Sequence, residues 1–159
     1  MEYLFMSLAA VLVVIVDQFT KFRVVQTIPL HGHVDFLPGF LGFTYVQNPG
    51  AAFSSFEGAQ WLFALIFLLF AGFILWEFPK KKMPFTDFER WLIVLIFAGG
   101  LGNAIDRFRL GYVVDMIQTE FMNFPVFNVA DCFITCGCVL LIAHLVLFNR
   151  EFWKDEKKK

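Results

Sequence analysis

The sequence predicts an all-α membrane protein with four transmembrane helices and a small extracytoplasmic β-sheet. Hydrophobic residues make up 58% of its 159 residues and charged residues 17%, an apolar share well above that of an ordinary soluble domain. The apolar residues gather in four runs, each long enough to cross a hydrocarbon core about 30 Å thick. Because four such helices and their loops use most of the chain, we expect one polytopic membrane domain over residues 1–159.

The four expected spans are Tyr3–Val25, Ala59–Phe78, Trp91–Phe108 and Ala130–Phe148. The first differs from a cleaved secretory signal, because Glu2 and no basic residue precedes it and no small-x-small cleavage site follows it. We therefore expect this run to remain in the mature protein as a membrane span.

Basic residues indicate the orientation of these spans. Nine of the thirteen lysines and arginines lie in the 79–90 connection or in the C-terminal tail. Cytoplasmic loops of membrane proteins are enriched in these residues, so we expect both termini and the 79–90 connection to be cytoplasmic. Residues 26–58 and 109–129 then share the outer side of the membrane.

The outer segment 26–58 contains a strand signal. Large apolar residues alternate with small or polar residues over Leu41–Gln47, and glycine and proline lie around the run. A small sheet at the membrane surface is therefore expected. The net charge of −1 gives no support for nucleic-acid binding.

Ionisable residues at membrane depth are costly unless they are paired or hydrated, so each one is a candidate for function. Asp17 and Lys21 lie four residues apart and share one helix face near the outer end of the first span. They can form an ion pair that supports a site. The alternative is that Lys21 only extends its ammonium group to the membrane surface.

Small and turn-forming residues mark two further segments. Asn48–Phe53 is a turn signal before the second span, where small residues let the backbone approach a ligand closely. Gly99–Arg107 places glycines on the third span, which permits close helix packing, and ends in Asp106 and Arg107. We interpret Asp106 and Arg107 as a charged pair whose role, taken alone, is either structural or functional.

Asp115 and Asp131 are the carboxylates that we single out. Asn128 is a favoured N-cap and Asp131 suits the first turn of a helix, but this local explanation leaves Asp115 unexplained. The third and fourth spans are antiparallel neighbours, so Asp115 and Asp131 can meet over the loop between them. Two adjacent carboxylates share a proton and divide acid and base roles, an arrangement that activates water without a metal ion.

Other reactive side chains fit no site. We interpret the odd set Cys132, Cys136 and Cys138 as helix packing residues, because it matches neither a disulfide framework nor a zinc spacing. No acid or thiol cluster accompanies His31 and His33 in the sequence, so a metal site is not expected there, and we expect His144 to pack between helices. A serine mechanism would have only Ser54 and Ser55 on the outer side and remains a distant option.

The motifs together resemble the bacterial lipoprotein signal peptidases, also called type II signal peptidases. Five blocks occur in the family's order: Asp17–Lys21, Asn48–Phe53, Gly102–Arg107, Val114–Asp115 and Phe127–Asp131. The resemblance covers nearly the whole chain, and five ordered blocks are far more specific than any one of them. Met116 departs from the phenylalanine that is usual in the family, a change that concerns packing rather than chemistry.

The resemblance implies a four-helix membrane bundle with an outer β-cradle, and Asp115 and Asp131 as the catalytic pair of an aspartic endopeptidase. It implies supporting or substrate-binding roles for Asp17, Lys21, Asn48, Gly50, Asn103, Arg107, Asn128 and Ala130, without a metal or cofactor. The implied substrate is a diacylglyceryl-modified prolipoprotein, cut on the amino side of the lipidated cysteine. The implied location is the bacterial inner membrane, with the active site toward the extracytoplasmic face.

The resemblance also implies contact with membrane lipid and inhibition by a cyclic peptide of the globomycin type, and we expect a monomer. The alternative function is a small membrane transporter or proton-relay subunit. Its charges would follow a path across the bilayer, whereas the cytoplasmic halves of the four expected spans are nearly free of charge. Intramembrane proteases of the presenilin or prepilin peptidase kind carry a Gly-x-Gly-Asp element that neither Val113–Asp115 nor Val129–Asp131 supplies.

Overall fold

The computed structural model describes residues 1–50 and 60–154. Four long helices and three strands make up most of this part of the chain, followed by one short helix. In chain order the elements are α1 (Glu2–Thr27), β1 (His33–Leu37), β2 (Leu41–Asn48), α2 (Gln60–Lys80), α3 (Asp87–Leu110), β3 (Val113–Thr119), α4 (Val129–Leu147) and α5 (Arg150–Trp153).

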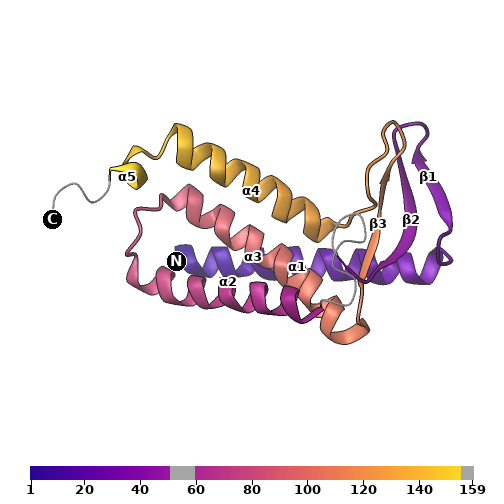
Figure 1. The fold of residues 1–159 in the computed structure, drawn as a ribbon, viewed down its shortest axis with the longest axis horizontal. Coiled ribbons are helices and arrows are strands. Elements are labelled where there is room, and N and C mark those ends of the chain that lie inside the picture. Colours follow the sequence, from indigo (N-terminus) through magenta and orange to yellow (C-terminus); the bar gives the residue numbers. More distant parts are fainter. Residues whose placement is uncertain (51–59, 155–159) are drawn as a thin grey trace.

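The four long helices lie side by side, and the sheet is at one end of them (Figure 1). We call this the sheet end: α1 and α3 finish there, and α2 and α4 begin there. The chain begins at the opposite end, where α5 also lies. Helix α3 is central, because it contacts α1, α2 and α4. All four helices are long and apolar enough to cross a membrane, as the composition predicted.

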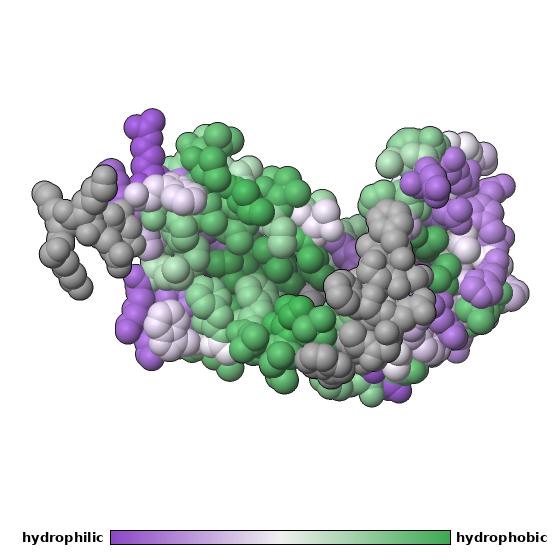
Figure 2. Space-filling view, in the orientation of Figure 1, coloured by the Kyte–Doolittle hydropathy of each residue, from purple (hydrophilic) through white to green (hydrophobic). Residues whose placement is uncertain are grey.

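Two glycines allow the close approach of helices around α3. A Cβ atom at Gly99 would lie 2.5 Å from the carbonyl oxygen of Ala130 on α4, and one at Gly102 would lie 2.5 Å from Asp17 Oδ2 on α1. Small residues permit such packing in membrane bundles. The outward faces of the helices carry apolar side chains, which form a broad hydrophobic band between two more polar ends (Figure 2).

The helix boundaries differ from the expected spans by a few residues, and at α3 a polar cap extends the helix beyond the apolar run. Helix α3 begins at Asp87 since Thr86 accepts a hydrogen bond from the Glu89 N–H, and the Glu89 side chain accepts one from the Thr86 N–H. It ends at Leu110, where Gly111 has a left-handed φ of 81°.

The sheet is antiparallel with the order β1-β2-β3. Strand β2 confirms the expected strand, whereas β1 and β3 were not predicted. Asp115 lies on β3 and is paired with Val46 of β2. Val24 and Ile28 pack with Tyr45, Val114 and Met116 in a buried core that joins the end of α1 to the sheet.

Charged side chains also lie inside the opposite end, where few were expected. Glu77 and Glu89 are fully buried: Glu77 pairs with Arg90 at 3.3 Å, and Glu89 is 2.8 Å from His144 Nδ1. Asn149 donates a further hydrogen bond of 2.6 Å to Glu89. His144 of α4 packs on Phe88 of α3, as expected, and in addition bonds the buried Glu89.

Candidate active site

A cavity of about 630 Å³ lies between helices α2, α3 and α4 and the sheet. Phe63, Phe67 and Phe70 of α2 form much of an apolar wall, with Ile96 and Ile134 from α3 and α4. Its polar lining includes Asn48, Asn103, Arg107, Asp115 and Asp131, together with Thr135. The structure thus brings five of the residues selected from the sequence to one apolar cavity.

Asp115 reaches this cavity from β3 and is only 2% exposed. Asn48 Nδ2 donates to its Oδ2 at 2.9 Å, and Asn128 Nδ2 donates to its Oδ1 at 2.6 Å. Burial raises the pKa of the Asp115 carboxyl to about 6, and the charge of Asp131 acts in the same direction, while the amide of Asn48 opposes it. Two amide donors therefore hold a carboxyl group that takes up a proton more readily than usual.

Asp131 lies in the first turn of α4, where it forms a reciprocal capping box with Asn128. Asn103 Nδ2 donates to Asp131 Oδ1 at 2.7 Å. The fully buried Asn128 connects the two aspartates: its Oδ1 accepts from the Asp131 backbone N–H at 2.9 Å, its Nδ2 donates to the Asp115 carboxylate, and its backbone N–H donates to Asp131 Oδ2 at 3.2 Å. The capping explanation of Asn128 is thus confirmed, and the same residue also bonds Asp115.

Lys21 is the centre of a buried network beneath these aspartates. Its Nζ lies 2.8 Å from Asp17 Oδ2 and 3.1 Å from Asp106 Oδ2, and it donates to Asn103 Oδ1 at 2.9 Å. The predicted pairing of Asp17 with Lys21 is confirmed, and the side chain is only 3% exposed rather than extended to the surface. Asp17 Oδ1 also accepts from the N–H of Ala130, which fixes the start of α4 on α1.

The interpretation of Asp106 and Arg107 as a pair was wrong. Adjacent helical residues point in different directions, and Asp106 instead bonds Lys21 and accepts from the Val114 N–H at 3.1 Å. Asp106 was not selected as a site residue, nor was Gln18, which donates to it at 2.9 Å. The signal that could have found Asp106 was its place one residue before Arg107 in a recognised motif.

Arg107 holds the end of β2 in place. Its Nη2 donates to the Gly50 carbonyl at 3.1 Å, and its guanidinium lies 4.4 Å from the ring centroid of Phe63. Asn48 Oδ1 accepts from the Gly50 N–H at 3.0 Å. The rest of the predicted turn, residues 51–53, lies outside the described residues, as do Ser54 and Ser55 of the serine alternative.

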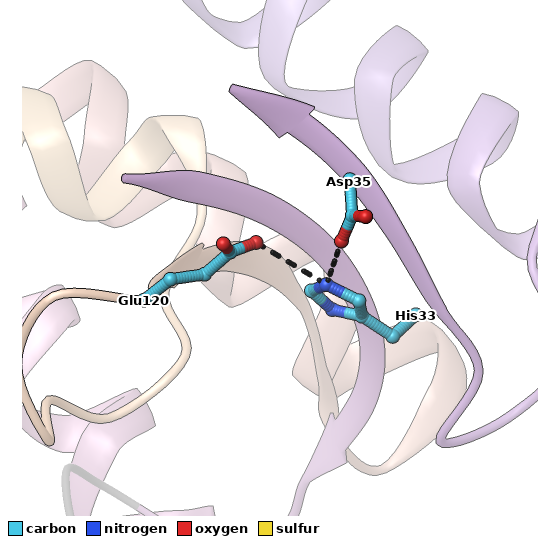
Figure 3. A group of neighbouring side chains, drawn as sticks. All are labelled: His33, Asp35 and Glu120. Carbon is cyan, nitrogen blue, oxygen red and sulfur yellow. Dashed lines mark hydrogen bonds and ion pairs between the residues drawn. The ribbon is translucent and has the colours of Figure 1, made fainter. Parts of the chain in front are cut away.

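Two smaller expectations need correction. Cys132 and Cys136 line the cavity, so they do more than pack between helices. His33 does have acidic neighbours: its Nε2 lies 2.9 Å from Asp35 Oδ1 and 3.3 Å from Glu120 Oε1 (Figure 3). Glu120 is distant in sequence and reaches His33 only because the sheet brings the ends of β1 and β3 together.

Residues 9–147 match the family described as Signal peptidase (SPase) II. The chain belongs to the signal peptidase II family. It is 40% identical to the lipoprotein signal peptidases of Streptococcus pyogenes serotype M2 (strain MGAS10270) and serotype M5 (strain Manfredo), over 94% of this chain and 93% of each relative. Two solved bacterial membrane enzymes determined by the in meso method are 36% identical. Their TM-scores are 0.82 and 0.80, with 97% and 90% of this chain and 93% of each of theirs covered.

The resemblance drawn from the sequence motifs is therefore confirmed, and so is the fold of four membrane helices with a small sheet. This signal peptidase II is a multi-pass membrane peptidase that removes signal peptides from prolipoproteins. The transporter alternative is not favoured.

Proposed function

We propose that this signal peptidase II is an aspartic endopeptidase with Asp115 and Asp131 as its catalytic pair. The observation that carries the proposal is the position of these two carboxylates on one apolar cavity, where Asn128 donates to Asp115 through its side chain and to Asp131 through its backbone N–H. Neither carboxylate has a salt bridge within residues 1–50 and 60–154, and the side chains that donate to them are neutral amides. Such a pair holds one proton between its members and has both an acid and a base available.

Hydrolysis then needs one water and one shared proton. The ionised aspartate removes a proton from water, the resulting hydroxide attacks the scissile carbonyl carbon, and the protonated aspartate donates to the carbonyl oxygen. As the tetrahedral diol collapses and its C–N bond breaks, the protonated aspartate donates its proton to the leaving amine, and one hydroxyl of the diol gives its proton to the ionised aspartate. The enzyme returns to its starting state with one proton on the pair.

The surrounding residues support this chemistry from fixed positions. Asn48, Asn103 and Asn128 donate to the carboxylates and orient them. The Lys21 network holds α1 and α3 together beneath the pair, and Ala130 attaches α4 to the same network through its N–H. Arg107 and Gly50 fix the end of β2 beside the cavity.

The substrate that suits this cavity is a diacylglyceryl-modified prolipoprotein, cut on the amino side of the lipidated cysteine. A wall of phenylalanine and isoleucine side chains favours an acyl chain over a polar side chain, because burial of apolar surface is the main attraction there. A cyclic, apolar peptide of the globomycin type would compete for the same surface. The enzyme acts as a monomer and a single domain over residues 1–159.

The active site faces the outside of the bacterial inner membrane, with both termini in the cytoplasm. The basic residues of the 79–90 connection support this orientation, since Lys80, Lys81 and Lys82 lie at the end opposite the sheet. In a cysteine-free background, a single cysteine at position 35 should react with an impermeant reagent in intact cells, and one at position 82 only after permeabilisation. Labelling of position 82 alone in intact cells would reverse the orientation.

The substrate is tested with purified enzyme and two forms of one prolipoprotein, with and without the diacylglyceryl group. We expect cleavage of the lipidated precursor, with the new N-terminus at the modified cysteine by mass spectrometry. Equal rates on the two precursors would contradict a lipid-dependent site. The Asp115→Asn enzyme is the control for contaminating peptidases, because it removes the carboxylate but keeps the size of the native residue.

A further inference from the structure

A second group of reactive side chains lies on the sheet, and the proposed hydrolysis does not use it. His33 and Asp35 come from β1, and Glu120 directly follows β3 (Figure 3). One imidazole nitrogen and one oxygen from each carboxylate all lie within 4.8 Å of one another. This geometry offers three potential ligands to one cation.

The sheet builds this group through a glycine in its central strand. Asp35 and Gln118 are both paired with Gly42 of β2, on its two sides. A Cβ atom at Gly42 would lie 2.6 Å from Glu120 Oε1 and 2.8 Å from His33 Nε2. The absence of a side chain at Gly42 therefore leaves the space in which residues from β1 and β3 meet above β2.

The hydrogen bonds around His33 determine which ring nitrogen faces the acids. The Thr44 hydroxyl donates to Gln118 Oε1, so its oxygen accepts from His33 Nδ1 at 2.7 Å. With the proton on Nδ1, the Nε2 lone pair of a neutral imidazole points toward Asp35 and Glu120. Histidine ligands of metals have this arrangement, in which the second ring nitrogen donates to a neighbouring group.

A backbone hydrogen bond also orients the Glu120 carboxylate toward His33. Its Oε2 accepts from the Gly39 N–H at 2.6 Å, which turns Oε1 toward His33. Oε1 is buried and accepts no hydrogen bond from the described residues. A lone pair of Nε2 and two carboxylate oxygens all attract positive charge, so a cation between them would be stabilised by all three.

We propose that His33, Asp35 and Glu120 bind a divalent transition-metal cation of the Zn²⁺ class. One imidazole nitrogen with two carboxylate oxygens matches the ligand preference of zinc, whereas Ca²⁺ and Mg²⁺ are bound by oxygen ligands. Three protein ligands leave one position for water, on the side where Asp35 is exposed. The bound ion links β1 to the end of β3 and thereby stiffens the sheet that carries Asn48 and Asp115.

The competing explanation is a proton on Nε2, which would make His33 an imidazolium between two carboxylates. The test uses the full chain in detergent, freed of metal by a chelator, with Zn²⁺ binding measured by competition against a chromogenic chelator. We expect one Zn²⁺ per chain and a higher unfolding temperature with Zn²⁺, but no such change with Ca²⁺ or Mg²⁺. A parent chain that binds no Zn²⁺ would show that a proton occupies the group.

His33→Asn and Glu120→Gln should each weaken Zn²⁺ binding at least about tenfold. In both variants Zn²⁺ should no longer raise the unfolding temperature. His31→Asn is the matched control: it makes the same change in the same segment, and Asn tolerates the left-handed φ of 62° at His31. This control should bind Zn²⁺ like the parent. Equal binding by the His33 variant and the parent would place the ion elsewhere and overturn the proposal.

Gly42→Ala tests the geometry without removing a ligand. Its methyl group would occupy the space between His33 and Glu120, so binding should fall although all three ligands remain. Asp35→Asn is a second variant that should fold even if Gly42→Ala does not, because the Asp35 side chain is 64% exposed and its replacement leaves packing intact. Its Zn²⁺ binding should also fall. Undiminished Zn²⁺ binding by Asp35→Asn and Gly42→Ala would exclude this group as the site.

Discussion

The two ends of the bundle both bury charges, but they arrange them differently. At the opposite end, Glu77 accepts from Arg90 and from the N–H groups of Lys82 and Met83. Glu89 there is satisfied by His144, Asn149 and the Thr86 N–H. At the sheet end, Asp115 and Asp131 receive amide donors but no ion pair among the described residues, and both line the cavity.

This difference separates structural charges from chemical ones. A buried carboxylate that has a basic partner and lies away from the cavity can stabilise a helix end, but it offers nothing to water or substrate. A carboxylate held by neutral amides beside a cavity keeps its affinity for a proton. The same residue type therefore serves stability at one end and, in our proposal, catalysis at the other.

The largest effect is expected from the catalytic pair. Asp115→Asn or Asp131→Asn should each lower turnover on the order of 10³-fold or more, because acid and base contributions are typically 10² to 10⁴-fold. The double variant should lose little beyond that, since groups acting as a unit are not additive. Protein level and thermal unfolding should hardly change. Activity of either variant within about tenfold of the parent would remove the pair from the mechanism.

Substitution of a buried charge at the opposite end should lower stability and leave turnover nearly unchanged. Glu77→Gln leaves the Arg90 guanidinium buried without its carboxylate, and breaking a buried ion pair costs about 3–5 kcal/mol. The unfolding temperature in detergent should fall, while turnover per folded molecule stays within about twofold of the parent, because Glu77 does not line the cavity. A loss of turnover without a loss of stability would mean that the two ends are not separate.

Asp17→Asn should give an intermediate result. The sequence alone predicted that Lys21 would lose its partner, but Asp106 and Asn103 also contact its Nζ. We therefore expect a destabilisation of about 2 kcal/mol, below the full cost of an unpaired buried charge, and a roughly tenfold loss of turnover. Asp106→Asn is the matched comparison, because it removes the other carboxylate. If both single variants unfold like the parent, Lys21 does not depend on its charge partners.

The helices and one strand could be predicted because their signals are local. Apolar runs long enough to span a bilayer gave the four helices, and alternation over Leu41–Gln47 gave β2. Strand β1 was missed since all its residues are exposed, and β3 was missed since its first four are all buried. Neither strand alternates in burial, so neither carries the periodic signal of a half-buried strand.

The site contacts that lie within one helix could be predicted from residue spacing and capping motifs. Asp17 with Lys21 followed from the four-residue spacing, and Asn128 with Asp131 from capping. Contacts between elements could not be found in this way. Only the folded chain shows that Asp106 turns to Lys21 instead of Arg107, or that Glu120 meets His33 across β2.

The smallest effect concerns the pH dependence of the sheet end. If the working pair carries one proton, kcat/KM should fall as pH rises through the pKa of Asp115, about 6, because both carboxylates are then ionised. Asn48 donates to Asp115 and stabilises its ionised form, so Asn48→Ala should raise this pKa. The alkaline limb of kcat/KM should then move to higher pH.

The expected displacement is on the order of one pH unit, since a hydrogen bond to a charged group contributes about 1.5–3 kcal/mol and one unit corresponds to about 1.4 kcal/mol. Gln47→Ala is a suitable control, because the Gln47 side chain bonds the hydroxyls of Tyr45 and Tyr112 instead of a carboxylate. Its profile should match the parent's. A shift on the acid limb alone would assign Asp115 the role of the base that must be ionised, and an unchanged profile would mean that Asn48 does not tune the pair.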